Sequence, residues 1–488
     1  MSAELVIKQA KIHDVLSLET LVNDFSEVLK SRKYPNAPVG ILADNSSDWI
    51  ALDLATQHLD ITLIPIPHFF SHEQKQYLID STNIFTLFSD QKDIFDLLGF
   101  DLHIGQCHSF FLSRSLNYES HPINKDIQKI TFTSGTTSQP KGVCLSSNQQ
   151  WSVAKSLDYG LEHLEIKRHL CLLPLSVLLE NVAGVYSSFL SHTEVFVFPL
   201  KEIGFQNLFN FDANQCLSKI DEYKIESIIL LPQMLRSILN AIQPHDSRIQ
   251  SLKFVALGGA KTPRLLLQKA KDFGLPVYEG YGLSECSSVV SLNLPHAHKM
   301  GSVGKPLSNR KIRIAEDHEI EIFLTDTVHY LGEASTSYTW FKTGDIGHID
   351  EDGFLFIDGR KKNIIITSYG RNISPEWPEG LLMEQGLLME QGLYKQVMVV
   401  GEAQPYLSAL ILPASDISHE TIETSIRAIN KELPNYASIL NYFILSEPFT
   451  YANGQLTENG RLKREAIESK YQTEINTLYE SPKDLSVI

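Results

Sequence analysis

The chain has 488 residues, of which 43% are hydrophobic and 20% charged, so it is long enough to form more than one globular domain. Its net charge of -16 argues against a nucleic-acid or anionic-membrane surface, because either surface would need clustered Lys and Arg side chains. A local basic pocket for an anion is still compatible with this charge.

The cysteines and the hydropathy pattern indicate the compartment. Five cysteines are widely scattered without a Cys-x-x-Cys pair, so we expect reduced, mostly buried thiols and neither a disulfide framework nor a zinc site. No apolar run approaches the ~18–20 residues of a membrane span, and the first residues lack a basic segment followed by an apolar core. These features predict a cytoplasmic protein without an integral membrane segment.

Strands and helices are predicted to alternate over the first two-thirds of the chain. Apolar runs predict strands at 39–43, 61–66, 84–88, 227–231 and 254–257. Helices are expected after the capping segment Asn45-Ser-Ser-Asp and around 233–242. The repeated order strand, helix, strand predicts an α/β fold with mostly parallel sheets flanked by helices.

The pattern changes in the last third. Alternating apolar residues between Lys311 and Leu324 predict antiparallel strands and a small β subdomain. Beyond Gly359-Arg-Lys-Lys, strands at 364–366, 397–400 and 409–412 and a helix near 422–429 predict a compact α+β unit. We therefore predict an N-terminal domain of residues 1–361 and a C-terminal domain of residues 362–488. The basic Arg-Lys-Lys is either a solvated turn or a hinge.

A tandem repeat interrupts the C-terminal unit. Gly380-Leu-Leu-Met-Glu-Gln385 is followed at once by the same six residues, 386–391. Six extra helical residues rotate the downstream part of a helix by about two-thirds of a turn, at ~3.6 residues per turn. We predict local disorder or a protruding loop there, which a continuous helix from Pro375 to Leu393 would contradict.

The segment from Thr131 to Leu145 concentrates hydroxyl groups, glycines and one lysine between two predicted strands. Gly135 and Gly142 allow backbone N–H groups to approach an anion, and Lys141 adds a positive charge. The segment is not a Walker A loop, because Gly142 rather than Ser or Thr follows Lys141. The pattern predicts a phosphate-binding loop, and a polar hairpin loop is the alternative.

Several ordered motifs together resemble the adenylate-forming superfamily of acyl-CoA synthetases, adenylation domains and luciferases, and the resemblance covers nearly the whole chain. They are Thr133-Ser-Gly-Thr-Thr-Ser-Gln-Pro-Lys-Gly142, Tyr281-Gly-Leu-Ser-Glu285, Phe341-Lys-Thr-Gly-Asp345 and Gly359-Arg360. Gly258-Gly-Ala260 resembles the family's turn at the edge of the adenine and acyl pockets. A plain tight turn is an equal reading of those two glycines.

The resemblance implies an ATP site and a magnesium site. The residues implied to bind ATP are Thr133, Ser134, Gly135, Thr136, Thr137, Lys141, Gly259, Ala260, Tyr281, Gly282, Ser284, Asp345 and Arg360. Within this set, the aromatic ring of Tyr281 stacks on adenine and Asp345 binds the ribose hydroxyls. Glu285 holds Mg²⁺, and Lys362 is the hinge between the domains.

These assignments also make chemical sense. Attack of a carboxylate on ATP places negative charge on phosphate oxygens, which Lys141, backbone N–H groups and Mg²⁺ stabilise. Mg²⁺ prefers one or two carboxylates together with phosphate and water, which suits Glu285. Taken alone, Glu285 is also compatible with a helix-capping element and Asp345 with a Gly-Asp turn.

Three positions depart from the family's pattern. Ser138 replaces a usual glycine in the phosphate loop, and Val177 stands where an aromatic or His gates the acyl tunnel. The neighbouring Leu178-Leu-Glu-Asn181 lines that tunnel or begins a buried helix. In the tail motif Gly454–Arg464, Arg461 replaces the lysine that the family uses in adenylation. We predict that Arg461 takes this role, although Arg and Lys are not interchangeable; Lys463 would need a displaced loop.

The resemblance implies an AMP-forming acid–thiol ligase with Arg461, Lys141 and Glu285 as catalytic residues. It would convert a carboxylic acid, with a fatty acid favoured, into an acyl-adenylate and then transfer the acyl group to a thiol. The thiol belongs to CoA or to the 4'-phosphopantetheine of an acyl carrier protein. Rotation at Lys362 would exchange Arg461 for Tyr369-Gly-Arg-Asn-Ile. An ADP-forming ATPase or kinase and a non-catalytic nucleotide-binding homologue are the alternatives.

Overall fold

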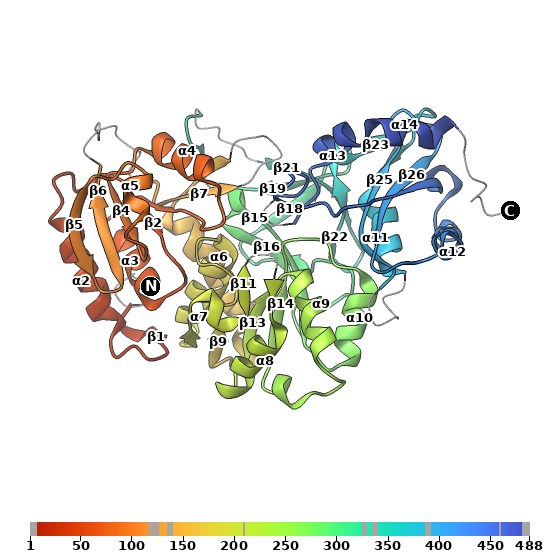
Figure 1. Cartoon of the computed structure of the whole chain (residues 1–488). Coiled ribbons are helices and arrows are strands. Elements are labelled where there is room, and N and C mark those ends of the chain that lie inside the picture. Colours follow the sequence, from red (N-terminus) through yellow and green to blue (C-terminus); the bar gives the residue numbers. More distant parts are fainter. Residues whose placement is uncertain are drawn as a thin grey trace.

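A computed structural model of the chain describes residues 7–115, 118, 126–133, 140–207, 210–324, 329–333, 340–385, 392–457 and 460–480. Figure 1 shows a broad N-terminal part and a smaller C-terminal part beside it. None of the helices in these ranges combines the length and apolar character that a membrane crossing requires. The five cysteines are buried and unpaired with one another, as predicted.

The first large sheet is built mainly from residues before position 146. Its strand order is β20 (His329–Tyr330), β8 (Lys141–Leu145), β7 (Lys129–Thr133), β3 (Leu63–Pro65), β2 (Val39–Leu42), β4 (Thr86–Ser89), β6 (Phe110–Arg114) and β5 (Leu102–Cys107). Strands β7, β3, β2 and β4 are parallel, whereas β8 and β6 run antiparallel to their neighbours. The helices of this region are α2 (Leu18–Lys30), α3 (Ser47–His58), α4 (His72–Thr82) and α5 (Ile94–Leu97).

Local sequence explains where these helices begin. Helix α3 starts after Ser46, whose Oγ accepts the Trp49 N–H at 3.1 Å, so the predicted cap is confirmed. Ser71 forms the corresponding cap of α4, in which the Gln74 side chain also reaches back to the Ser71 backbone. Strands β2, β3 and β4 are buried along their whole length, as is usual for strands of a parallel sheet that is covered on both faces.

The second large sheet supplies the walls of the cavity described below. Its order is β1 (Lys11–Ile12), β10 (Glu194–Phe196), β9 (Arg168–Leu170), β13 (Ser227–Leu230), β14 (Phe254–Leu257), β15 (Val277–Leu283), β16 (Ser288–Leu292) and β17 (Lys305–Pro306). Strands β1 to β15 in this order are parallel, and β16 is antiparallel to β15. The helices of this region are α6 (Ser147–Leu161), the π-helix η2 (Leu179–Tyr186), α7 (Ser187–Leu190), α8 (Ala213–Glu222), α9 (Pro232–Ala241) and α10 (Arg264–Asp272).

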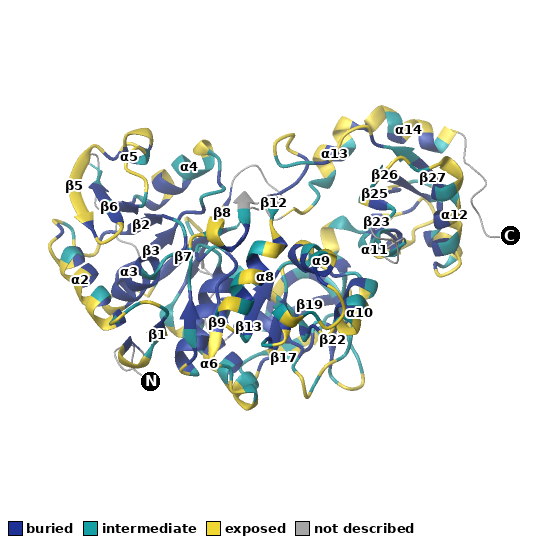
Figure 2. Cartoon of the chain, turned by 60° about the horizontal axis from the view of Figure 1, so that its bottom comes forward, coloured by how far each residue is buried: buried dark blue, intermediate teal, exposed yellow. Residues whose placement is uncertain are grey.

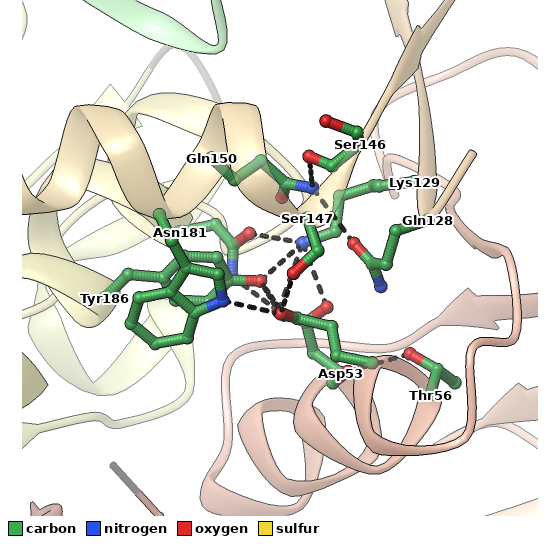
Figure 3. Close-up of polar contacts among 11 residues, drawn as sticks. Asp53, Thr56, Gln128, Lys129, Ser146, Ser147, Gln150, Asn181 and Tyr186 are labelled. Atoms are coloured by element: carbon green, nitrogen blue, oxygen red, sulfur yellow. Dashed lines mark hydrogen bonds and ion pairs between the residues drawn. The ribbon is translucent and has the colours of Figure 1, made fainter. Parts of the chain in front are cut away.

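A buried polar network ties the two sheets together (Figure 3). The Lys129 ammonium on β7 lies 2.9 Å from Asp53 Oδ1 on α3 and donates to Asn181 Oδ1 on η2 at 2.5 Å. The Tyr186 hydroxyl, also on η2, donates to Asp53 Oδ2 at 2.6 Å. All four side chains are buried, so the lysine's charge is compensated within the protein. The network anchors β7 at Lys129, its first residue. The predicted phosphate loop begins at the other end of the strand, at Thr133.

The antiparallel subdomain predicted between Lys311 and Leu324 is present. The sheet has the order β18 (Lys311–Ile314), β19 (Glu319–Phe323), β21 (Trp340–Ile349) and β22 (Leu355–Arg360). Ile314 pairs with Ile320 across the predicted turn. Asp345 on β21 pairs with Arg360 on β22, so this sheet brings two predicted ribose-binding residues side by side.

The C-terminal part has a hydrophobic core of its own, with strands β25 and β26 drawn in the buried colour in Figure 2. Its strands are β23 (Ile365–Ile366), β24 (Asn372–Ile373), β25 (Tyr394–Val400), β26 (Leu407–Pro413) and β27 (Ile439–Ile444). Its helices are α11 (Glu376–Glu384), α12 (His419–Asn430), α13 (Arg464–Lys470) and α14 (Gln472–Glu480). This agrees with the predicted α+β unit, and the boundary at residue 362 stays a prediction.

The tandem repeat begins inside helix α11, which ends at Glu384 with Gln385 as an extended cap. The Leu393 N–H donates to the Gln385 carbonyl at 3.4 Å, so the chain returns to the point where the helix stops. The second copy, 386–391, lies outside the described residues, and so does the predicted loop or disorder. The described residues exclude an unbroken helix through Gln385.

Candidate active site

Tyr281, Asp345 and Arg360 form the centre of the candidate site, as the motifs predict. The Tyr281 hydroxyl donates to Asp345 Oδ2 at 2.5 Å, and Arg360 Nε lies 2.6 Å from Asp345 Oδ1. Burial raises the pKa of Asp345, whereas Arg360 and the Tyr281 hydroxyl oppose that rise. Both oxygens of a buried carboxylate are thereby held in place beside Tyr281, which lines a cleft together with Gly259, Ser284 and Arg461.

The segment after Tyr281 depends on a close backbone approach. A Cβ atom on Gly282 would lie 1.6 Å from the Ser288 carbonyl oxygen, so only glycine fits there. The chain then enters a short 3₁₀ turn, η5 (Ser284–Cys286), which presents Glu285. Glu285 Oε1 accepts a hydrogen bond from the Tyr330 hydroxyl at 2.8 Å.

Glu285 fits the magnesium role that its motif implies. It supplies a carboxylate whose Oε1 is oriented by a tyrosine hydroxyl, and hydrogen-bonded carboxylates of this kind are usual in metal sites. Mg²⁺ takes few protein carboxylates and completes its coordination with phosphate and water. The donor set is therefore chemically suitable for Mg²⁺ beside a nucleotide.

Lys141 lies at the start of β8, beside Tyr330. Its ammonium is 5.3 Å from the centre of the Tyr330 ring and 3.9 Å from Glu333 Oε1. Thr133, at the end of β7, pairs with Lys141 across the two strands. The other predicted phosphate-binding residues, Ser134, Gly135, Thr136 and Thr137, and the unusual Ser138 lie outside the described residues.

Arg461 reaches the cleft from the C-terminal part. Its Nη2 donates to the carbonyl oxygen of Gly259 at 2.7 Å, next to the predicted nucleotide-binding Ala260. Lys463, the alternative, is the N-cap residue just before helix α13, and its N–H donates to the Gln455 carbonyl. Tyr369, of the segment predicted to alternate with Arg461, lies on a hairpin and is 76% exposed. The structure therefore brings Arg461, and not the Tyr369 segment, to the site.

A cavity of about 870 Å³ continues from this cleft into the N-terminal part. At one end it is lined by Gly259 and Ser284, which follow the carboxyl ends of strands β14 and β15, and by Arg461 of the tail motif. At the other end it is lined by Lys167 and His192, which lie where strands β9 and β10 begin. The cavity therefore runs along the strands of the second sheet, from their carboxyl ends to their amino ends.

Part of the cavity lining is apolar. Val177, Leu179, Ala183, Leu231 and Phe254 contribute to it. Val177, at the position where the resemblance implies a gating residue, is therefore one of the aliphatic lining residues. Both readings of Leu178–Asn181 are correct in part, because Leu178 and Leu179 line the cavity, whereas Glu180 and Asn181 are buried in hydrogen bonds.

Glu180 belongs to a cluster with His169 and Cys171 whose ligand atoms lie close enough to hold a metal ion. Its Oε1 lies 2.9 Å from His169 Nε2, and its Oε2 accepts the N–H groups of Leu172 and Leu173. Both carboxylate oxygens are thus used to hold the strand β9 end against η2. We interpret the cluster as structural support for the cavity wall.

Tyr330 is a site residue to which the sequence patterns did not point. It follows both of the motifs that it touches in the chain, and nothing in its local sequence distinguishes it from a core tyrosine. Its place depends on the antiparallel pairing of β20 with β8, where Tyr330 faces Val143.

Residues 16–333 match the model of the AMP-binding enzyme family, and residues 362–483 match the AMP-binding enzyme C-terminal domain. The first match alone covers more than half of the chain, so the chain belongs to the AMP-binding enzyme family, which confirms the predicted adenylate-forming superfamily. The predicted α/β architecture is confirmed with it.

Relatives within this family are named for different carboxylic acid substrates. The chain is 33% identical over 252 residues to the long-chain-fatty-acid–CoA ligase FadD15 of Mycobacterium bovis. That match covers 46% of this chain and 41% of the relative, so the chain matches less than half the length of this relative. A 2-succinylbenzoate–CoA ligase of Bacillus pumilus is 27% identical over 401 residues, which cover 78% of this chain and 79% of that one.

Solved structures show the same fold. The o-succinylbenzoate CoA synthetase of Bacillus subtilis, in complex with its acyl-adenylate, matches with a TM-score of 0.74 at 20% identity. The match covers 96% of each chain, so it includes both parts of the molecule.

Proposed function

We propose that this chain is an AMP-forming acid–CoA ligase whose substrate is a long aliphatic carboxylic acid. The observation that carries the proposal is the apolar cavity that extends from Arg461 and Gly259 along the second sheet. Lys167, which precedes β9, and Leu173, which follows it by three residues, both line the cavity, so the cavity extends past both ends of this strand.

The residues around the cavity mouth support an adenylation step. The acid's carboxylate would lie near Gly259 and attack the α-phosphorus of ATP, and the bond to pyrophosphate would break. Arg461 is placed to donate to the developing negative charge, and Lys141 is placed to bind the β- and γ-phosphates. Glu285 would hold Mg²⁺, which when bound neutralises phosphate charge. Asp345 and Arg360 would orient the ribose, and the ring of Tyr281 would stack on the adenine.

The second half-reaction needs a thiol in place of Arg461. Rotation of residues 362–488 about Lys362 would withdraw Arg461 and present the exposed hairpin at Tyr369. The CoA thiolate would then attack the acyl carbonyl and release AMP. CoA is favoured over a carrier protein because the matched relatives are named as CoA ligases.

A compact aromatic acid is the second candidate, because 2-succinylbenzoate–CoA ligase matches 78% of this chain. Acid-dependent ATP–pyrophosphate exchange, measured with hexanoic, dodecanoic, hexadecanoic and 2-succinylbenzoic acids, discriminates between the two. We expect the highest kcat/KM with the longest of these acids, and AMP rather than ADP as the product. A preference for 2-succinylbenzoate would replace our substrate proposal, and acid-independent ADP formation would overturn the ligase proposal.

A further inference from the structure

Tyr330 touches both of the charged groups that are predicted to handle the phosphates and the metal ion. Its hydroxyl donates to Glu285 Oε1 at 2.8 Å, and the centre of its ring lies 5.3 Å from Lys141 Nζ. Glu285 comes from the turn after β15, and Lys141 comes from β8. One side chain therefore connects the two large sheets of the N-terminal part at the candidate site.

The backbone holds Tyr330 firmly against the strand that carries Lys141. Tyr330 pairs with Val143 of β8, and the next residue, Leu331, donates its N–H to the Gly142 carbonyl at 2.9 Å. Its ring also packs on the apolar cluster that contains Cys286 and Val290. The position of the hydroxyl is thus fixed by strand pairing and packing before any ligand binds.

Each contact has a distinct physical effect. A hydrogen bond to one carboxylate oxygen of Glu285 selects the side-chain rotamer and leaves the other oxygen for a metal ion, as outer-shell groups of metal sites do. The face of the aromatic ring attracts the Lys141 ammonium, which is otherwise near only Glu333 among the contacts described. Without the ring, that exposed lysine side chain would sample more rotamers before it met phosphate.

We propose that Tyr330 is a positioning residue that sets Glu285 for the metal ion through its hydroxyl and Lys141 for the phosphates through its ring. This inference rests on the proposed function, since it assumes that Mg·ATP binds at Glu285. The two contacts belong to different parts of the side chain, so substitutions can separate them.

Two substitutions test the proposal. Tyr330→Phe removes the hydroxyl and keeps the ring, whereas Tyr330→Leu removes both. Tyr159→Phe is the matched control, because Tyr159 is 74% exposed on α6 and does not line the cavity. Mn²⁺ affinity in the presence of ATP is measured by electron paramagnetic resonance, metal-free ATP affinity by calorimetry, and folding by thermal unfolding.

For Tyr330→Phe we expect Mn²⁺ to bind about tenfold more weakly, at the lower end of outer-shell effects, with metal-free ATP binding unchanged. For Tyr330→Leu we expect the same loss for Mn²⁺ and also weaker metal-free ATP binding. Unchanged Mn²⁺ affinity in folded Tyr330→Phe overturns the inference, and that variant decides alone if Tyr330→Leu does not fold.

The inference and the proposed function can fail separately. If the wild type shows no acid-dependent pyrophosphate exchange but Tyr330→Phe still weakens Mn·ATP binding, only the ligase proposal fails. If exchange is present and Tyr330→Phe binds Mn²⁺ like the wild type, only the role of Tyr330 fails.

Discussion

The Nη2 atom of Arg461 lies 2.7 Å from the carbonyl oxygen of Gly259, although 202 positions separate the two residues. Gly259 has a positive φ of 86° and follows β14, where the cavity meets the cleft. A side chain from the C-terminal part thereby completes a site that is otherwise built by the N-terminal part. Under the proposed function, we expect this arrangement to serve adenylation rather than thiol transfer.

Replacement of Arg461 should impair adenylation selectively. We expect Arg461→Ala to slow acid-dependent pyrophosphate exchange by about 100-fold, because one donor to the developing charge is lost. Arg461→Lys should retain more activity than Arg461→Ala, and Lys463→Ala should stay close to the wild type. Loss of exchange in Lys463→Ala alone would show that our assignment of Arg461 is wrong.

Glu384 connects the first copy of the tandem repeat to the N-terminal part. Its Oε1 accepts the N–H of Arg264 at 2.7 Å, at the start of α10, where Pro263 provides no side-chain cap. A carboxylate that caps a helix N-terminus stabilises the helix by about 1 kcal/mol. We expect Glu384→Ala to slow adenylation by roughly fivefold and to leave thioester formation from supplied acyl-adenylate unchanged or faster. Glu384→Gln keeps a hydrogen-bond acceptor, so its adenylation rate should lie between those of the wild type and Glu384→Ala. Equal slowing of both half-reactions would argue against an effect on the orientation of the C-terminal part.

Ala183 offers a test of the acyl path. It lies on the π-helix η2 and lines the cavity. Ala183→Leu adds bulk there, so we expect kcat/KM for hexadecanoic acid to fall at least about tenfold. Hexanoic acid serves as the control, because it would not reach Ala183, and its rate should change little. If both acids are affected alike, the acyl chain does not follow this cavity.

Glu279 should make stability depend on pH. Its side chain is 7% exposed on β15, and burial raises its pKa to about 7. The Gly301 N–H donates a hydrogen bond to Glu279 Oε2 at 3.2 Å, which partly offsets this rise in pKa. Because the folded state holds the proton more tightly, this group stabilises the protein below its unfolded pKa, and that contribution is lost as pH rises through 7. The loss corresponds to at most about 3 kcal/mol.

We expect Glu279→Gln to lower this pH dependence, since an amide does not titrate in that range. Denaturant unfolding at pH 5 and pH 8 measures it. The free energy of unfolding of the variant, minus that of the wild type, should be higher at pH 8 than at pH 5. The same wild-type-to-variant difference at both pH values would contradict the raised pKa.

Much of the architecture was predictable from local patterns. The apolar runs at 39–43 and 254–257 correspond to β2 and β14, and the predicted capping segment Asn45-Ser-Ser-Asp contains Ser46, which caps α3. These features depend on residues within one or two turns of each other, so the sequence contains their physical cause. The termination of α11 at Glu384 was harder to predict, because the repeat Gly380–Gln385 continues into an identical hexapeptide.

The sequence by itself determined the family and the order of the motifs, and it named the candidate nucleotide-binding side chains, since these depend on residue types at short spacing. Only the tertiary structure decided that Arg461 contacts Gly259, that Tyr330 joins Lys141 to Glu285, and that an apolar cavity follows the second sheet. Each of these arises from the pairing and packing of segments far apart in the chain. Long-range contacts of this kind leave no periodic signal in the local sequence.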